Sequence, residues 1–146
     1  MPYVGSFLEA YLVGEVDIVK AMVERTQLDL EEREEYGGTQ LHLAAHDGHF
    51  PVVHYLCEQG ANKEARRRRK WIPLHFAASY GRLLVVQYLC EQGAHKEARN
   101  TNGEIPLHFA ASYGRLLVVQ YLCEQGAHKE ARNTNGETPL HWAALL

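Results

Sequence analysis

The stretch PLHFAASYGRLLVVQYLCEQGAHKEARNTNGE occurs twice in this chain, as residues 73–104 and as residues 106–137, so the two copies lie 33 positions apart. Related tetrapeptides recur with the same period at residues 39–42, 72–75, 105–108 and 138–141. A fixed period of this length indicates a solenoid, in which each supersecondary unit packs only on its neighbours. Such a fold presents one long ribbon of surface rather than a closed pocket.

The repeated unit contains signals for two short helices and a loop. Pro73 suits the first turn of a helix, because its missing N–H has no partner there, and Gly81 predicts the end of that helix. Apolar residues then recur at helical spacing over about residues 83–91, which predicts a second helix. The polar stretch that follows contains Asn102-Gly103, a signal for a tight turn with positive φ. We therefore expect a helix–turn–helix followed by a projecting, hairpin-like loop.

This unit resembles the ankyrin repeat, and the resemblance covers roughly residues 5–146. It rests on the period, the recurring Pro-Leu-His-x-Ala-Ala start, the glycine between the helices, the Val-Val-x-Tyr-Leu run and the closing Gly-Ala. The resemblance implies an all-α fold, an ankyrin-repeat solenoid of stacked helix–turn–helix units with β-hairpin-like loops that project like fingers. It also implies that a recurring histidine ties neighbouring loops together by hydrogen bonds, at His42, His75, His108 and His141.

We expect a single repeat domain over residues 1–146. Its units are a diverged N-terminal capping repeat at residues 5–38, repeats at residues 39–71, 72–104 and 105–137, and a truncated repeat at residues 138–146. The chain stops partway through the first helix of the last unit, which would leave the final stacking face partly bare. Two explanations stay open: a fragment of a longer array, or a face that meets another molecule.

Composition and charge are those of an ordinary soluble chain, with 46% hydrophobic residues, 23% charged residues and a net charge of −3. This small charge by itself does not indicate nucleic acid or an acidic substrate as a partner. Glu9, Glu15 and Asp17 interrupt the first apolar stretch, which excludes a signal-peptide core, and no apolar run is long enough to cross a bilayer. We expect no membrane association, and a location in the cytoplasm or, alternatively, the nucleus.

The three cysteines point to a reducing environment. Cys57, Cys90 and Cys123 lie one period apart, so they occupy one equivalent position in successive units. Neighbouring units stack at roughly 10 Å, the usual helix-packing distance, which exceeds the Cα separation that a disulfide tolerates. We therefore expect reduced, packed thiols in an intracellular protein, with no redox or metal role.

The resemblance implies that binding is carried by the positions that vary between repeats, namely the loop tips and the two residues before the inter-helix glycine. These positions predict a partner-binding surface that consists of His46, Asp47, Arg67, Arg68, Arg69, Trp71, Tyr80 and Tyr113. Tyrosine provides a large contact area at low entropic cost, and tryptophan and arginine are enriched at binding hot spots. The alternative for the two tyrosines is a packed position on the inner face.

The run from Arg66 to Lys70 reads RRRRK and forms one loop tip. Lys70 replaces the glycine of the equivalent tips, which should strain or reshape this loop if φ is positive there. Three interpretations stay open: a solvated run neutralised by Glu34 and Glu35 of the preceding loop, a protein-binding tip, or a nuclear-import or anion-binding signal. Nucleic acid is disfavoured because the basic residues occupy one tip rather than a stripe along the molecule.

The sequence contains none of the motifs GxxxxGK[ST], HExxH, CxxC and GxSxG, which would indicate nucleotide binding, metalloprotease, redox or hydrolase chemistry. Catalysis also needs unlike groups that converge in a water-poor cleft, whereas a solenoid repeats like groups at even spacing. We therefore predict a non-catalytic protein–protein interaction module. It would bind a protein partner through its concave face and loop tips, with no cofactor, metal ion or small-molecule substrate.

Two other functions stay open. One is a nuclear-targeting, anion or nucleic-acid contact through the basic tip, and the other is a structural spacer, recently duplicated or engineered, because two identical units offer little surface variety. A further prediction concerns self-association. It would occur through the bare C-terminal face, or through Leu84 and Leu117, which stand where the second helix of the family normally shows a polar residue.

Overall fold

A computed structural model describes residues 16–26 and 29–143 of the chain. Within these residues the structure has eight α-helices, one 3₁₀ helix and no strand. Their bounds are α2 (Val16–Thr26), α3 (Gln40–Asp47), α4 (Phe50–Glu58), η1 (Arg68–Lys70), α5 (Pro73–Ser79), α6 (Leu83–Glu91), α7 (Pro106–Ser112), α8 (Leu116–Glu124) and α9 (Pro139–Ala143). In the described ranges no helix has the length and apolar character needed to span a bilayer.

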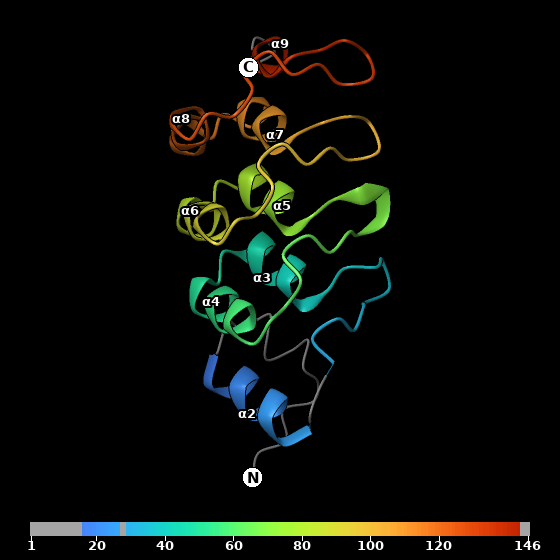
Figure 1. Cartoon of the computed structure of the whole chain (residues 1–146), viewed down its shortest axis with the longest axis vertical. Coiled ribbons are helices and arrows are strands. Elements are labelled where there is room, and N and C mark those ends of the chain that lie inside the picture. Colours follow the sequence, from blue (N-terminus) through green and yellow to red (C-terminus); the bar gives the residue numbers. More distant parts are fainter. Residues whose placement is uncertain (1–15, 27–28, 144–146) are drawn as a thin grey trace.

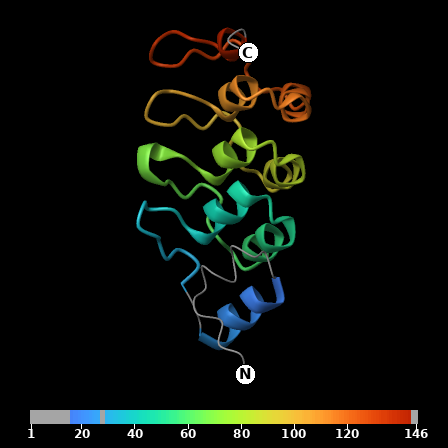
Figure 2. The same ribbon diagram turned by 180° about the vertical axis from the view of Figure 1, so that it is seen from behind.

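The helices form two columns. Helices α3, α5, α7 and α9 pack one on another in the first column, and α4, α6 and α8 do so in the second. Helix α2 packs against α4 at the end of the stack. The loops project from the first column on the side opposite the second column, as Figures 1 and 2 show. The expected all-α solenoid of helix pairs with projecting, hairpin-like loops is confirmed.

Each helix pair follows the predicted pattern of start and stop residues. Helix α5 begins at Pro73, and α6 spans Leu83–Glu91 as expected. Gly81 lies between them with φ +68°, in the left-handed region where a Cβ strains the backbone. A Cβ at this position would also lie 2.9 Å from the Cδ atom of Arg115 in the next unit. Gly81 is therefore needed both for the turn and for the approach of the next unit.

The recurring histidines link successive loops, as the resemblance implied. The Nδ1 atom of His75 accepts a hydrogen bond from the backbone N–H of Ile72 at 3.1 Å, so the proton lies on Nε2. Nε2 then donates to the carbonyl oxygen of Glu104 at 3.0 Å, at the end of the next projecting loop. His42 and His108 make equivalent bonds. Burial lowers the pKa of His42 and of His75 to about 4, so both rings are neutral at pH 7.

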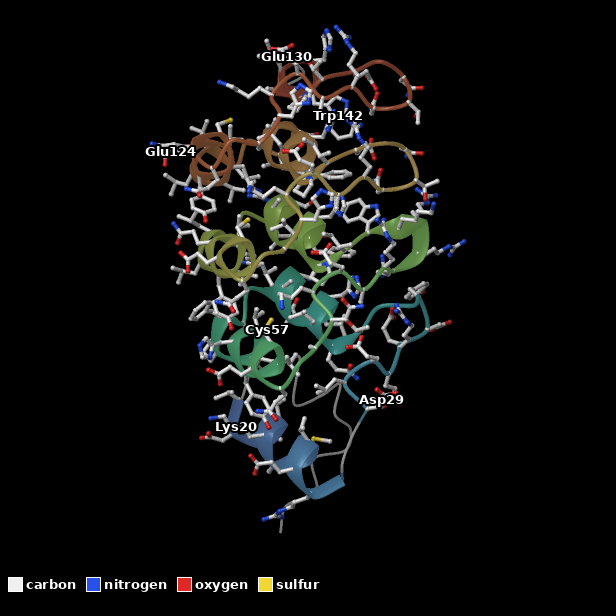
Figure 3. The ribbon with its side chains drawn as sticks, in the orientation of Figure 1. Lys20, Asp29, Cys57, Glu124, Glu130 and Trp142 are labelled. Carbon is white, nitrogen blue, oxygen red and sulfur yellow. The ribbon has the colours of Figure 1, made fainter. Side chains whose placement is uncertain are left out.

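The core lies between the two columns, and Figure 3 shows side chains filling this space. Its fully buried aliphatic residues include Leu41, Leu56, Leu74, Leu89 and Leu122. The three cysteines are free and half-buried on the helices of the second column. Burial raises the pKa of the Cys57 and Cys90 thiols to about 11, so both are protonated at neutral pH. These thiols are packing groups rather than reactive ones.

Both ends of the expected domain division extend beyond the described residues. Of the N-terminal capping repeat, the structure describes α2 and the residues from 29 onward, while 1–15 and 27–28 lie outside. At the other end, Leu116 is 78% exposed and Leu140 is 74% exposed. Leu83, which precedes Leu116 by one period, is half-buried where α8 packs on α6. The last face is therefore partly bare over the described residues, and 144–146 lie outside them.

Candidate functional site

Four projecting loops carry most of the predicted binding residues, and we call them the first to fourth fingers. They comprise residues 29–38, 62–71, 95–104 and 128–137. Each finger closes through a pair of backbone hydrogen bonds at its tip. In the third finger, the N–H of Asn100 donates to the carbonyl of Glu104 and the N–H of Gly103 donates to the carbonyl of Asn100, both at 3.0 Å. Gly103 has φ +74°, as the Asn-Gly pair predicted.

A ladder of arginines holds the fingers side by side. Nη1 of Arg99 donates to the carbonyl of Gly103 in its own finger at 2.7 Å and to the carbonyl of Arg132 in the next finger at 2.8 Å. Arg33 makes the same pair of bonds within the first finger and to the second. Arg66 bonds the carbonyls of Lys70 and Arg99. Arg66 therefore belongs to the scaffold, although the sequence placed it within a basic run.

Glutamates form a second set of links between fingers. The Oε1 atom of Glu31 accepts a hydrogen bond from the backbone N–H of Asn62 at 2.8 Å. Glu64 and Glu97 accept equivalent bonds from the units that follow them. Sequence reasoning missed both ladders, although the 33-residue recurrence of the arginines and glutamates was a signal that could have revealed them. Together the ladders make the fingers a preformed platform.

An open cleft with a volume of about 230 Å³ lies between the first two fingers and α3. Its lining consists of Glu34, Tyr36, Gly38, His42, Leu43, His46, Asp47, Arg67 and Phe76. We call this hollow the finger cleft. It brings together three of the predicted binding residues, His46, Asp47 and Arg67. The cleft contains two carboxylates, two aromatic rings, one guanidinium and two imidazoles, so the site combines charge with apolar contact area.

Arg67 contacts three neighbouring side chains. Its Nε atom lies 3.8 Å from Oε1 of Glu34, which confirms the expected pairing of these two residues. Its guanidinium carbon lies 5.7 Å from the ring centre of Tyr36 and 5.3 Å from that of Phe76, within the range of cation–π attraction. Because residues of the two flanking units make these contacts, the position of Arg67 could not be read from its own repeat.

His46 and Asp47 connect the cleft to the first predicted tyrosine. Nδ1 of His46 lies 2.7 Å from Oδ1 of Asp47. The ring of Tyr80 lies 4.1 Å from the ring of His46 between centres, at 52°. Tyr80 is 43% exposed and Tyr113, one unit further along, is 58% exposed. Both tyrosines are therefore surface residues, and the packed alternative is wrong for them.

Trp71 is placed differently from the other predicted residues. Its half-buried ring lies between Phe76, at 4.8 Å between ring centres, and Phe109, at 4.4 Å. Trp142 continues this aromatic row beyond Phe109 at 5.5 Å (Figure 3). Trp71 thus contributes to packing between units beside the finger cleft, and its role as a binding anchor stays a prediction.

The tip of the second finger has an unusual backbone. Arg69 has φ +64° and Lys70 has φ +63°, and the three residues from Arg68 to Lys70 form η1, the broad green ribbon at the end of this finger in Figure 1. The expected reshaping at Lys70 is therefore present and extends to its neighbour. Among the described residues, no carboxylate lies within 4.0 Å of Arg68, so the expected pairing with Glu35 is absent.

A metal site finds no support in the described part of the chain. There, no group of three or more histidine, cysteine, aspartate or glutamate side chains is arranged to hold a metal ion. The recurring histidines, arginines and glutamates outside the cleft serve the fold, because they bond backbone atoms of neighbouring fingers. The chemistry that the finger cleft offers is recognition by charge, hydrogen bonds and aromatic contact.

Comparison with known proteins identifies one family. The family described as ankyrin repeats (3 copies) matches residues 7–100 and 96–146. Protein phosphatase 1 regulatory subunit 27 from Homo sapiens is 39% identical over 57 residues, which is 39% of this chain and 36% of that protein. Alpha-latrocrustotoxin-Lt1a from Latrodectus tredecimguttatus is 40% identical over 57 residues, which is 39% of this chain and 4% of that protein.

A further relative carries the name of an enzyme. Palmitoyltransferase akr1 from Schizosaccharomyces pombe is 36% identical over 61 residues, which is 42% of this chain and 10% of that protein. The chain thus spans between 4% and 36% of the length of these three relatives.

Proposed function

The chain belongs to the ankyrin repeat family, and we propose that it is a non-catalytic module that binds a protein partner through the finger cleft and the adjoining tyrosines. Ankyrin repeats are in general protein–protein interaction modules. The observation that carries the proposal is the finger cleft itself, where His46, Asp47 and Arg67 meet beside the exposed ring of Tyr80. Tyr113 extends this surface by one unit.

The composition of this surface supports protein recognition. Arginine and tyrosine are the side chains that most often dominate the energy of protein interfaces. The aromatic rings around Arg67 exclude water from one side of its guanidinium, which strengthens a bond to an incoming group. The two ladders between fingers fix the backbone before binding, so little conformational entropy is lost on association.

A binding role fits the relative that is named as a regulatory subunit of a phosphatase. It also fits the way that polar residues are used in this chain. Many of them recur at equivalent positions and bond backbone atoms of neighbouring fingers, as expected of a scaffold that presents a binding surface.

The test is quantitative capture of partners from a native lysate with the intact chain and with the variant Arg67→Ala/Tyr80→Ala/Tyr113→Ala. Trp71 is left in place, because its removal would open a hole between Phe76 and Phe109. The matched control replaces three exposed residues at the C-terminal ends of α6 and α8, Gln92→Ala/Glu124→Ala/Gln125→Ala.

The proposal expects a partner that the intact chain and the control retain and the first variant loses, in both low and high salt. Thermal unfolding of each variant checks that the fold is kept. A partner that all three proteins retain would contradict the assignment to the finger cleft. A partner that all three proteins retain in low salt and lose in high salt would instead indicate a contact at the basic tip of the second finger.

A further inference from the structure

We propose that Arg68, Arg69 and Lys70, which we call the basic fingertip, form a docking site for an acidic segment of the protein partner. This inference rests on the proposed function, because it names the chemistry of a partner that also meets the finger cleft. The basic fingertip and the cleft are continuous, since Arg67 lines the cleft and directly precedes Arg68 in the chain.

Among the described residues, two basic side chains in the run from Arg66 to Lys70 have partners within the protein, and three have no carboxylate partner. Of the five basic residues in the run, Arg66 bonds backbone carbonyls and Arg67 pairs with Glu34. The remaining three side chains are exposed, and in the described part of the chain no carboxylate lies within 4.0 Å of them. The nearby first finger contributes Glu35, which is also exposed. Three unpaired positive charges therefore stand together on a chain whose net charge is −3.

The backbone of the basic fingertip is strained. Arg69 and Lys70 both adopt a left-handed conformation that residues with a Cβ rarely take. The equivalent residues of the third finger are Asn102 and Gly103, of which only Gly103 has a positive φ, and neither carries a charge. An unstrained tip therefore exists in the same chain, one unit away. Residues held in such a conformation cluster at functional sites, where surrounding structure maintains the strain.

Backbone hydrogen bonds fix the basic fingertip before any partner binds. The N–H of Thr101 in the third finger donates to the carbonyl of Arg69 at 2.8 Å, so the strained tip is fixed to its neighbour. Within the tip, the N–H of Arg67 donates to the carbonyl of Trp71 and the N–H of Lys70 donates to the carbonyl of Arg67, both at 2.8 Å. The three charges therefore project from a closed turn. Because the backbone is already fixed, binding of carboxylates orders only the three side chains.

The size of the patch favours a short peptide segment over nucleic acid. The equivalent tips of the third and fourth fingers read Asn-Thr-Asn-Gly and carry no charge at these places. A duplex follows a stripe of basic residues, whereas a few consecutive or helix-spaced carboxylates match a single tip. An acidic peptide is the simplest ligand that could bind all three basic side chains of the fingertip at once.

The test measures binding of a fluorescein-labelled polyglutamate peptide to the full chain by fluorescence anisotropy at low ionic strength. The variant Arg68→Thr/Arg69→Asn/Lys70→Gly copies the tip of the third finger. The matched control Lys63→Gln/Lys96→Gln/Lys129→Gln removes the same charge from one equivalent position in three units. We expect the tip variant to bind about tenfold more weakly than the intact chain, and the control less than about twofold more weakly.

Three outcomes would overturn the inference: no binding by the intact chain, equal weakening by both variants, or unchanged binding by the tip variant. A duplex DNA and vesicles of phosphatidylserine serve as competing probes, and tighter binding of either to the intact chain would also overturn it. The tip variant should in addition unfold at a higher temperature, since it removes two strained residues. None of these results bears on the finger cleft, which partner capture with the Arg67, Tyr80 and Tyr113 variant tests separately.

Discussion

His75 makes the stack sensitive to pH at the scale of one residue. Its folded-state pKa of about 4 lies below the ordinary value of 6.5, because burial disfavours the charged ring, and His42 behaves in the same way. The unfolded chain therefore binds more protons than the folded chain between these two values. The stabilising contribution of each neutral histidine is fully present above pH 6.5. The free energy of unfolding falls as the pH is lowered toward 4, by up to about 3 kcal/mol for each histidine.

Urea unfolding between about pH 7 and pH 5 measures this dependence. We expect the free energy of unfolding of the intact chain to fall over this range, and that of His75→Gln to fall less steeply, because glutamine does not titrate. The absolute stability of the variant is lower, so the slope is the informative quantity. Equal slopes for the two proteins would show that His75 is not the source of the effect.

At the scale of the helix pair, Gly81 serves the turn and the stacking of units at once. Replacement by alanine combines left-handed strain with a Cβ placed 2.9 Å from the Cδ atom of Arg115, whose Nε atom donates to the carbonyl of Ser79. Gly93 is the matched control, because it has φ +89° and no atom within 4 Å of an added Cβ. We expect a loss of about 2 kcal/mol for Gly81→Ala and about 1 kcal/mol for Gly93→Ala, measured by chemical unfolding. Equal losses would contradict the close approach.

The elements differ in how far the sequence predicts them. The bounds of α6 follow from local signals, because apolar spacing and glycine act within one unit. The position of Arg67 depends on Tyr36 and Phe76 from two other units, so no local pattern could place it. Trp71 reads as an exposed anchor beside arginine, but the rings of Phe76 and Phe109 enclose it from both sides. Contacts between units therefore decide the site, while the repeat decides the fold.

At the scale of the whole molecule, Leu84 and Leu117 predict self-association. They are 63% and 64% exposed, although α8 packs on α6 and, among the described residues, no helix packs on the far side of α8. Their exposure is therefore a property of the position rather than of the end of the stack. Because α6 and α8 are identical in sequence, a two-fold axis between them would bring Leu84 of each copy against Leu117 of the other.

Sedimentation equilibrium tests this prediction. We expect the intact chain to form dimers at high protein concentration and the variant Leu84→Gln/Leu117→Gln to remain monomeric. The pair Gln92→Ala/Gln125→Ala, at the other end of the same helices, controls for general surface effects. A monomeric intact chain at all concentrations would exclude this contact.

Hydrogen–deuterium exchange of the chain, alone and with its captured partner, measures whether the finger cleft binds the protein partner. We expect slower exchange in peptides that cover residues 34–47 and 67–80, which contain the cleft and Tyr80. Protection confined to α6 and α8, with unchanged exchange in the fingers, would contradict this expectation.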